Sequence, residues 1–304
     1  MSREIIEYLN PKNGDTVIDC TLGGGGHSAE ILPKIIPDGR IIGIDQDDDA
    51  ITAASDRLSG FPDNVTIVKG NFVQLDEIAS ELGIDSVDGI IFDLGVSSFQ
   101  LDTQERGFSF KGDAALDMRM SRDQELTAES LLNTYSENKL TDIIYRYGED
   151  RWAKRIAKFI IESRTRRPIK TTKELVDIIL AAVPVGARRD NIHPATRVFQ
   201  ALRIAVNDEM QSLETGLHAA IKLLGKNGVI CVLSYHSLED RIVKDTFLQY
   251  TGRCICPAAL PICSCGAIKS LDIITRRPLK SSGDEISANP RARSAKLRVA
   301  KKLL

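Results

Sequence analysis

The sequence of 304 residues predicts an α/β fold: a doubly wound parallel sheet interrupted by an inserted all-helical domain. Three observations predict it. A glycine-rich loop joins an apolar strand pattern to a helical one within residues 16–36. Short apolar runs then alternate with helical stretches to about residue 100, the order of a parallel sheet with right-handed crossovers. Residues 105–191, in contrast, contain helical patterns and no convincing strand.

The first part of the sheet domain is predicted over residues 1–104. Strand patterns lie at 16–20, 41–45, 65–69 and 88–93, and helical patterns at 28–36, 48–58 and 74–82. Ligands of such sheets bind beyond the carboxyl ends of the strands. Four segments are therefore expected to face one crevice there, with Asp19, Asp45, the Asn71-Phe72 pair and Asp93.

The loop after the first strand contains four consecutive glycines, Gly23 to Gly26. Without Cβ atoms the backbone can approach a ligand closely, and the following helix adds the positive end of its dipole. Gly24-x-Gly26-x-x-Ala29 also satisfies the dinucleotide fingerprint, and Asp45 lies where such folds place an acid on ribose hydroxyls. The pattern predicts a nucleotide-like ligand rather than a merely glycine-rich turn, without distinguishing NAD from S-adenosylmethionine.

Charge is divided unevenly along the chain. Residues 1–104 hold 6 Lys/Arg and 19 Asp/Glu, out of 40 and 42 in the whole chain, which leaves 34 and 23 for residues 105–304. Residues 151–173 alone carry nine Lys/Arg and one acid, and one helical face there presents Arg151, Lys154, Arg155 and Lys158. A solvated basic face is the alternative, but this asymmetry favours an RNA or DNA partner for the insert.

The second part of the sheet domain is predicted over residues 192–304. A long helix after His193-Pro194 precedes a buried strand at 229–234, whose end delivers Tyr235 and His236. Closing strands are expected at 273–275 and 297–299. The predicted domains are therefore 1–104 and 192–304 for the sheet, with 105–191 as the helical insert.

Composition favours a cytoplasmic protein without a membrane partner. No apolar run approaches the roughly 18 residues of a membrane span, and no secretory signal is recognised. Without such a signal, the six cysteines are expected to be reduced. Four of them could hold zinc, but C-x-C spacing is unusual for that metal and no metal site is assigned: Cys254, Cys256, Cys263 and Cys265. A monomer and a homodimer are both open.

Several further motifs are specific, and they occur in order from about residue 9 to the C-terminus. They are Asp93-Leu94-Gly95-Val96-Ser97-Ser98, Arg106-Gly107-Phe108-Ser109-Phe110, His193-Pro194-Ala195-Thr196-Arg197, Ser234-Tyr235-His236-Ser237-Leu238-Glu239 and Asn289-Pro290-Arg291-Ala292-Arg293-Ser294. Together they closely resemble the bacterial family of 16S rRNA (cytosine-N4)-methyltransferases. The family's His-x-Pro-Val segment has no counterpart in this sequence.

The resemblance implies a class I methyltransferase with a Rossmann-like sheet and a helical substrate-recognition insert. The methyl donor would be S-adenosylmethionine. The target would be the exocyclic N4 amine of one cytosine in the decoding region of 16S rRNA, in the small ribosomal subunit. Carried over by motif, the donor contacts would be Gly25, Gly26, His27, Asp45, Phe72, Asp93 and Gln100.

The chemistry of these side chains agrees with the implied contacts. Asp45 can accept both ribose hydroxyls, Phe72 offers a flat face to adenine, and Asp93 can hold the adenine amine or the methionine ammonium. His27 either binds the donor's carboxylate or caps the helix that it opens.

The catalytic groups are less directly indicated. The N4 lone pair of cytosine is delocalised into the ring, so the amine has to be held near the methyl group by positioned acceptors. Ser97 and His236 are the predicted catalytic residues, with Tyr235 as an alternative, and a purely structural role for His236 is equally consistent. Two other functions stay open: an NAD-dependent dehydrogenase, and a donor-binding RNA chaperone without catalysis.

Overall fold

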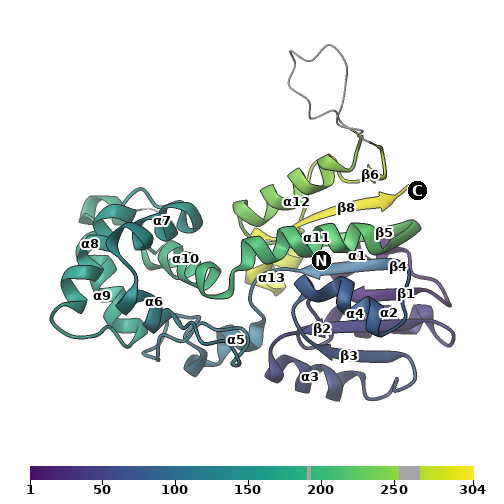
Figure 1. Cartoon of the computed structure of the whole chain (residues 1–304), viewed down its shortest axis with the longest axis horizontal. Helices are drawn as coiled ribbons and strands as arrows, with labels where there is room; N and C mark the ends of the chain where they lie inside the picture. The colour runs from purple at the N-terminus through teal and green to yellow at the C-terminus, as the bar shows by residue number, and fades with distance from the viewer. Residues whose placement is uncertain (190–192, 253–267) are drawn as a thin grey trace, which may run out of the picture. The chain divides into compact units, whose positions relative to one another are not determined.

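The computed structural model describes residues 1–189, 193–252 and 268–304, so the four cysteines of the zinc alternative lie outside the described residues. The chain divides into two compact units, a sheet unit of residues 1–95 and 210–304 and a helical unit of residues 96–209 (Figure 1). No helix of the described residues is long and apolar enough to cross a membrane.

The sheet unit contains one mixed sheet in the order β3-β2-β1-β4-β5-β8-β6, with β7 also paired to β8. The first five strands are parallel, and β8 runs antiparallel to β5, β6 and β7. The strands are β1 (Thr16–Asp19), β2 (Arg40–Asp45), β3 (Val65–Lys69), β4 (Val87–Asp93), β5 (Leu224–Ser234), β6 (Leu271–Ile273), β7 (Leu279–Lys280) and β8 (Lys296–Lys302). The strand order reverses between β1 and β4, which is where ligands of doubly wound sheets bind.

Helices cover both faces of this sheet. Alternate strand residues such as Ile18, Ile90 and Val232 join one apolar cluster, whereas Val17, Ile91 and Leu233 join another on the opposite face. The helices of the unit are α1 (Ser2–Leu9), α2 (Gly26–Ile35), α3 (Asp48–Leu58), α4 (Leu75–Glu81), α11 (Glu209–Leu223), α12 (Ser237–Gln249) and α13 (Gly283–Ala288), with short 3₁₀ turns η1 (Phe72–Gln74) and η4 (Pro290–Ser294). The buried strand patterns of the sequence therefore predicted the five parallel strands closely, whereas the closing strand expected at 273–275 is β6 at Leu271–Ile273 and the short β7 was not predicted.

The helical unit has an apolar core of its own. Its described residues form helices and a single β-bridge, between Ala115 and Thr171. The helices are α5 (Ser98–Asp102), α6 (Ala128–Thr134), α7 (Glu137–Gly148), α8 (Ala153–Arg164), α9 (Thr172–Ala182) and α10 (Ala195–Asn207), with 3₁₀ turns η2 (Gln104–Arg106) and η3 (Val185–Arg189). On α8 the apolar residues Ile156 and Ile160 are fully buried while Lys154, Arg155 and Lys158 are exposed, as the helical periodicity predicted; Arg151 is exposed as well but precedes the helix.

The unit extends beyond the residues 105–191 predicted for the insert. Its second boundary differs because α10 contributes apolar side chains, Val198 and Leu202 among them, to the core of the helical unit. The expected long helix after Pro194 is in fact two helices, since Asp208 adopts a left-handed conformation with φ 47° between α10 and α11. Asn207 completes this end by donating to the carbonyl oxygen of Met118.

Candidate active site in the sheet unit

The glycine loop leaves one side open for a ligand. Gly23 and Gly25 have φ values of 50° and 72°, which favour glycine. A Cβ on Gly25 would lie 3.3 Å from the Leu58 side chain, whereas a Cβ on Gly24 would meet nothing within 4 Å. The helix α2 begins at Gly26, so its first N–H groups lie beside this opening. The loop therefore has its inner side packed on α3 and its outer side free.

Asp19, at the end of β1, holds the glycine loop through hydrogen bonds to residues on both sides of it. Its side chain is buried and accepts hydrogen bonds from the Ser28 hydroxyl at 2.9 Å and from the Thr21 N–H at 3.3 Å. Burial raises the pKa of its carboxyl group, against the lowering effects of His27 and these hydrogen bonds. Asp19 thus fixes the start of α2 and is a structural member of the site.

Asp45 ties the end of β2 to the glycine loop. One carboxylate oxygen accepts the Gly23 N–H at 2.8 Å, and the other accepts the Asp47 N–H at 2.9 Å. Burial raises the pKa of Asp45 to about 6 in spite of these two donors. Because two backbone donors do not offset the burial, this carboxylate would be stabilised by further hydroxyl donors such as those of a ribose.

Asp93, at the end of β4, joins two other elements. The Tyr235 hydroxyl after β5 donates to one of its oxygens at 2.7 Å, and Nε2 of His27 lies 3.3 Å from the other. The Asp93 N–H donates to the Thr21 hydroxyl, which fixes the strand end as well. We call Asp93, His27 and Tyr235 the carboxylate triad.

Asp93 raises the pKa values of both other members of the carboxylate triad. Burial lowers the pKa of His27, but the hydrogen bond and charge of Asp93 outweigh it and raise that pKa overall. Burial and the Asp93 charge raise the pKa of Tyr235, so its hydroxyl stays protonated and can donate. His27 contacts Asp93, and no side chain caps the N-terminus of α2.

Phe72 forms part of a wall after β3. Its ring packs edge-to-face on Phe92 with centroids 5.4 Å apart, and a Cβ on Gly216 would lie 2.6 Å from its Cδ2. The side chain is only half-buried, so part of the ring is left for a ligand. Its role as an adenine contact stays a prediction.

His236 caps the helix α12. Its Nδ1 accepts the Glu239 N–H at 3.4 Å, and a Glu239 oxygen accepts the N–H groups of Tyr235 and His236 in return. Nε2 of His236 is buried and lies 3.0 Å from Glu239 without forming a hydrogen bond within the described chain. This reciprocal cap accounts for the histidine structurally, and its catalytic role stays a prediction.

Ser97 and Gln100 belong to the helical unit, where they cap α5 together. The Ser97 hydroxyl accepts the Gln100 N–H at 3.1 Å, and the Gln100 side chain accepts the Ser97 N–H at 3.0 Å. The predicted roles of these two residues in catalysis and donor binding stay predictions.

Several residues that build the site were not singled out from the sequence. Thr21 and Ser28 flank the glycine loop, and no pattern indicates that the Ser28 hydroxyl donates to the Asp19 carboxylate or that the Thr21 hydroxyl accepts the Asp93 backbone N–H. Glu239 had a usable signal, because a glutamate three residues after a capping residue is typical of a capping box.

The fold and this site define a class I methyltransferase that uses S-adenosylmethionine. A doubly wound sheet carries an antiparallel strand beside β5, and strand-end acids surround an open glycine loop. The chain belongs to the MraW methylase family, whose sequence profile matches residues 1–303. The predicted family, fold class, enzyme class and cofactor are confirmed, and the dehydrogenase alternative is not supported.

Named relatives cover nearly the whole chain. The "Ribosomal RNA small subunit methyltransferase H" of Symbiobacterium thermophilum is 52% identical over 301 residues, 99% of this chain and 95% of that protein. The protein of the same name from Geobacter sp. strain M21 is 51% identical over 300 residues, 99% and 96% of the two chains. A solved structure of a putative rRNA methylase from Clostridium thermocellum has 16% identity and a TM-score of 0.47, covering 99% of this chain and 95% of that one.

The residues present fit S-adenosylmethionine. The space beyond Gly24 admits a ligand against the backbone, and the half-buried Asp45 carboxylate lacks the donors that two ribose hydroxyls would supply. Gly25, Gly26 and His27 would lie along the donor, with the half-buried Phe72 beside the adenine. Asp93 would place a negative charge near a positively charged donor.

Donor binding is expected to tighten as pH rises from 5 to 7. The pKa of Asp45 is about 6 in the ligand-free protein because burial disfavours the ionised form. Ribose hydroxyls favour that ionised form, so binding lowers the pKa and releases a proton below pH 6. One pKa unit is about 1.4 kcal/mol, so affinity at pH 5 should be about tenfold weaker than at pH 7. Isothermal titration calorimetry at both pH values measures this.

His27 is a second titratable group beside the glycine loop, with its pKa raised above the usual value mainly by the hydrogen bond and charge of Asp93, so the control has to separate the two groups. Asp45→Asn removes only the Asp45 titration and keeps the contact between His27 and Asp93. A variant with the same pH dependence as the parent would contradict the assignment to Asp45.

Proposed function

We propose that this protein methylates the exocyclic N4 amine of one cytosine in the decoding region of 16S rRNA, within the small ribosomal subunit and in the cytoplasm. The observation that carries the proposal is the match, over nearly the whole chain, to proteins named as small-subunit rRNA methyltransferases. The motifs that resemble the cytosine-N4 family supply the target atom.

For this reaction the protein has to position the cytosine amine and the methyl donor and to place suitable charges beside them. S-adenosylmethionine, when bound, supplies an electrophilic methyl group. The sheet unit holds the carboxylate of Asp93 in one orientation through Tyr235 and His27. Ser97 and His236 are proposed to orient the cytosine amine and accept its N–H groups, so that the amine approaches at attack distance.

The target base has to leave its stack to reach this site. An amine inside a stacked helix cannot approach a sulfonium in line, so the cytosine is unpaired or extruded when it reacts. Recognition of the surrounding RNA is assigned to the helical unit, in which Arg151, just before α8, and Lys154, Arg155 and Lys158 on α8 are exposed.

Neutralising part of this basic face should weaken RNA binding and its salt dependence. Arg151 lies over the ring of Trp152 and Lys158 is paired with Glu162 at 3.7 Å, both at the surface. Changing Arg151, Lys154 and Lys158 to Gln removes three charges without touching buried residues. The slope of log K against log salt should fall by about 2, since each contact with a single strand contributes about 0.7. Fluorescence anisotropy with 16S rRNA fragments measures the slope.

A matched control removes the same charges from the sheet unit. Lys12, Lys34 and Arg40 are exposed there, and their change to Gln should leave the slope unchanged. Equal slopes for both triple variants would show that the face of α8 is only solvated.

The proposed product can be identified directly. Small subunits from cells that lack the enzyme are incubated with the protein and S-adenosylmethionine, and digested 16S rRNA is analysed by mass spectrometry. We expect N4-methylcytidine at a single site. Methyl groups on C5 of cytosine, on adenine or on protein would overturn the proposal, and RNA binding without any methyl transfer would favour the chaperone alternative.

A further inference from the structure

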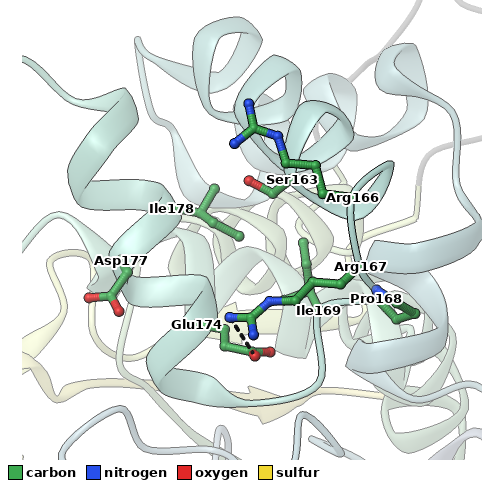
Figure 2. A pocket seen from close by; sticks show the side chains of 8 residues that line it. All are labelled: Ser163, Arg166, Arg167, Pro168, Ile169, Glu174, Asp177 and Ile178. Atoms are coloured by element: carbon green, nitrogen blue, oxygen red, sulfur yellow. Dashed lines mark ion pairs between the residues drawn. The ribbon is translucent and has the colours of Figure 1, made fainter.

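The helical unit contains a pocket of about 390 Å³ between the end of α8 and the start of α9 (Figure 2). Ser163 lines the pocket from the end of α8, and the connection that follows α8 supplies Arg166, Arg167 and Pro168. Ile169 and Ile178 give it an apolar part, and the side chains of Glu174 and Asp177 reach it from α9. A pocket of this size accommodates a small organic ligand.

One pair of charges in the pocket is already satisfied. Arg167 forms an ion pair with Glu174 at 3.1 Å, and Figure 2 shows this pair within the pocket. Glu174 also accepts the N–H groups of Lys170 and Thr171 at the start of α9, which lower its pKa. These contacts fix Glu174 and leave it little capacity for a ligand.

A second pair of charged side chains in the pocket, Arg166 and Asp177, forms no ion pair with any described residue. Neither the Arg166 guanidinium nor the Asp177 carboxylate has a side-chain hydrogen bond or ion pair within the described part of the chain. Both side chains are exposed and line the same pocket. The pocket thus offers a cationic donor, an anionic acceptor and an apolar surface that the protein itself leaves free.

These three features fit different parts of one nucleotide. Arg166 suits a phosphate, Pro168 and the isoleucines suit the flat face of a base, and Asp177 suits a base edge that donates N–H groups. If the ligand were a phosphate alone, its negative charge would lie near the negative charge of Asp177. If it were a cation alone, its positive charge would lie near that of Arg166. Guanine fits best, because its adjacent imino and amino groups can donate together to one carboxylate.

We propose that this pocket binds an unstacked guanine nucleotide of the RNA substrate, away from the cytosine that is methylated. The proposal rests on the proposed function for the presence of an RNA substrate. The charge of the neighbouring chain agrees with an RNA ligand, since residues 151–173, which include α8 and the connection that lines the pocket, carry nine Lys/Arg and one acid. The helical unit would then recognise a base as well as the phosphate backbone.

The test compares short uridine-rich RNA strands that carry one guanosine, one inosine or one adenosine, bound to the full-length protein and followed by fluorescence anisotropy. Inosine lacks only the amino group of guanine. We expect the guanosine strand to bind about 5- to 150-fold more tightly than the other two, the range of a well-formed base contact. Equal affinity for all three strands would overturn the inference.

Two variants locate the effect within the pocket. Asp177→Asn should reduce the preference for guanosine to less than about threefold, whereas Arg166→Gln should weaken all three strands and lower the salt slope by about 0.7. Asp142→Asn and Arg146→Gln on α7 change exposed residues of the same types outside the pocket and should alter neither quantity. A guanosine preference that survives Asp177→Asn would place recognition elsewhere and overturn the inference.

The inference and the proposed function fail separately. If N4-methylcytidine forms at one site but guanosine is not preferred, the pocket proposal is wrong and the function stands. If the preference exists and depends on Asp177 but no N4-methylcytidine forms, the pocket proposal stands and the target assignment is wrong.

Discussion

Asp45→Ala is expected to weaken S-adenosylmethionine binding by about 1.5–3 kcal/mol, the usual value of hydrogen bonds to a charged group. The carboxylate would lose its bonds to the ribose, and the glycine loop would lose the contact that Asp45 makes with the Gly23 N–H. Burial already disfavours the ionised form of Asp45. Its removal should therefore reduce donor affinity far more than it reduces the free energy of unfolding at pH 7.

Calorimetry measures the affinity, and thermal unfolding without donor verifies the fold. Asp48→Ala is the matched control, because Asp48 is close in sequence but has its side chain 56% exposed and paired with Lys69. Asp48→Ala should bind the donor like the parent. Parental affinity in a well-folded Asp45→Ala would remove Asp45 from the donor site.

The sheet could be predicted because its signals are local. Buried parallel strands are continuous apolar runs, and the acids that end β1, β2 and β4 mark where those runs meet the ligand edge. The glycines of the loop are a local signal as well, because they indicate a backbone with positive φ, which Gly23 and Gly25 adopt.

The boundaries of the helical unit could not be read in this way. The periodicity of α10 continues into α11, and only tertiary packing assigns Val198 and Leu202 to the helical core and Leu217 to the sheet. The left-handed turn at Asp208 separates the two helices without a glycine or proline to announce it.

The carboxylate triad also lay beyond sequence reasoning in its detail. The sequence motifs indicate His27, Asp93 and Tyr235 only as separate contacts of a ligand or a substrate. Their mutual hydrogen bonds depend on the pairing of β4 with both β1 and β5, which brings together residues up to 208 positions apart. Histidine at an N-terminal helix position suggests a cap, and only the fold shows that its ring is turned to a carboxylate.

The triad makes the second large prediction, for Asp93→Asn. The variant keeps the shape of the side chain but removes its charge, so we expect turnover to fall by about 10²–10³-fold, the range seen when one preorganised electrostatic contact to a transition state is removed. Tyr235→Phe removes one donor to the same carboxylate and should cost about tenfold. Single-turnover methylation of small subunits measures both rates.

A change in His27 distinguishes this role from general damage to the fold. The hydrogen bond and charge of Asp93 raise the pKa of His27 more than the charge of Asp19 does, so in Asp93→Asn burial is opposed by Asp19 alone and that pKa should fall. NMR titration of the chain's four histidines measures the shift, and His218, which contacts Tyr250, is the internal reference. A lower His27 pKa with unchanged turnover would make the triad a purely structural contact. Loss of turnover together with the shift, at an unchanged affinity for S-adenosylmethionine, would place the Asp93 charge in the reaction, because damage to the loop would weaken donor binding as well.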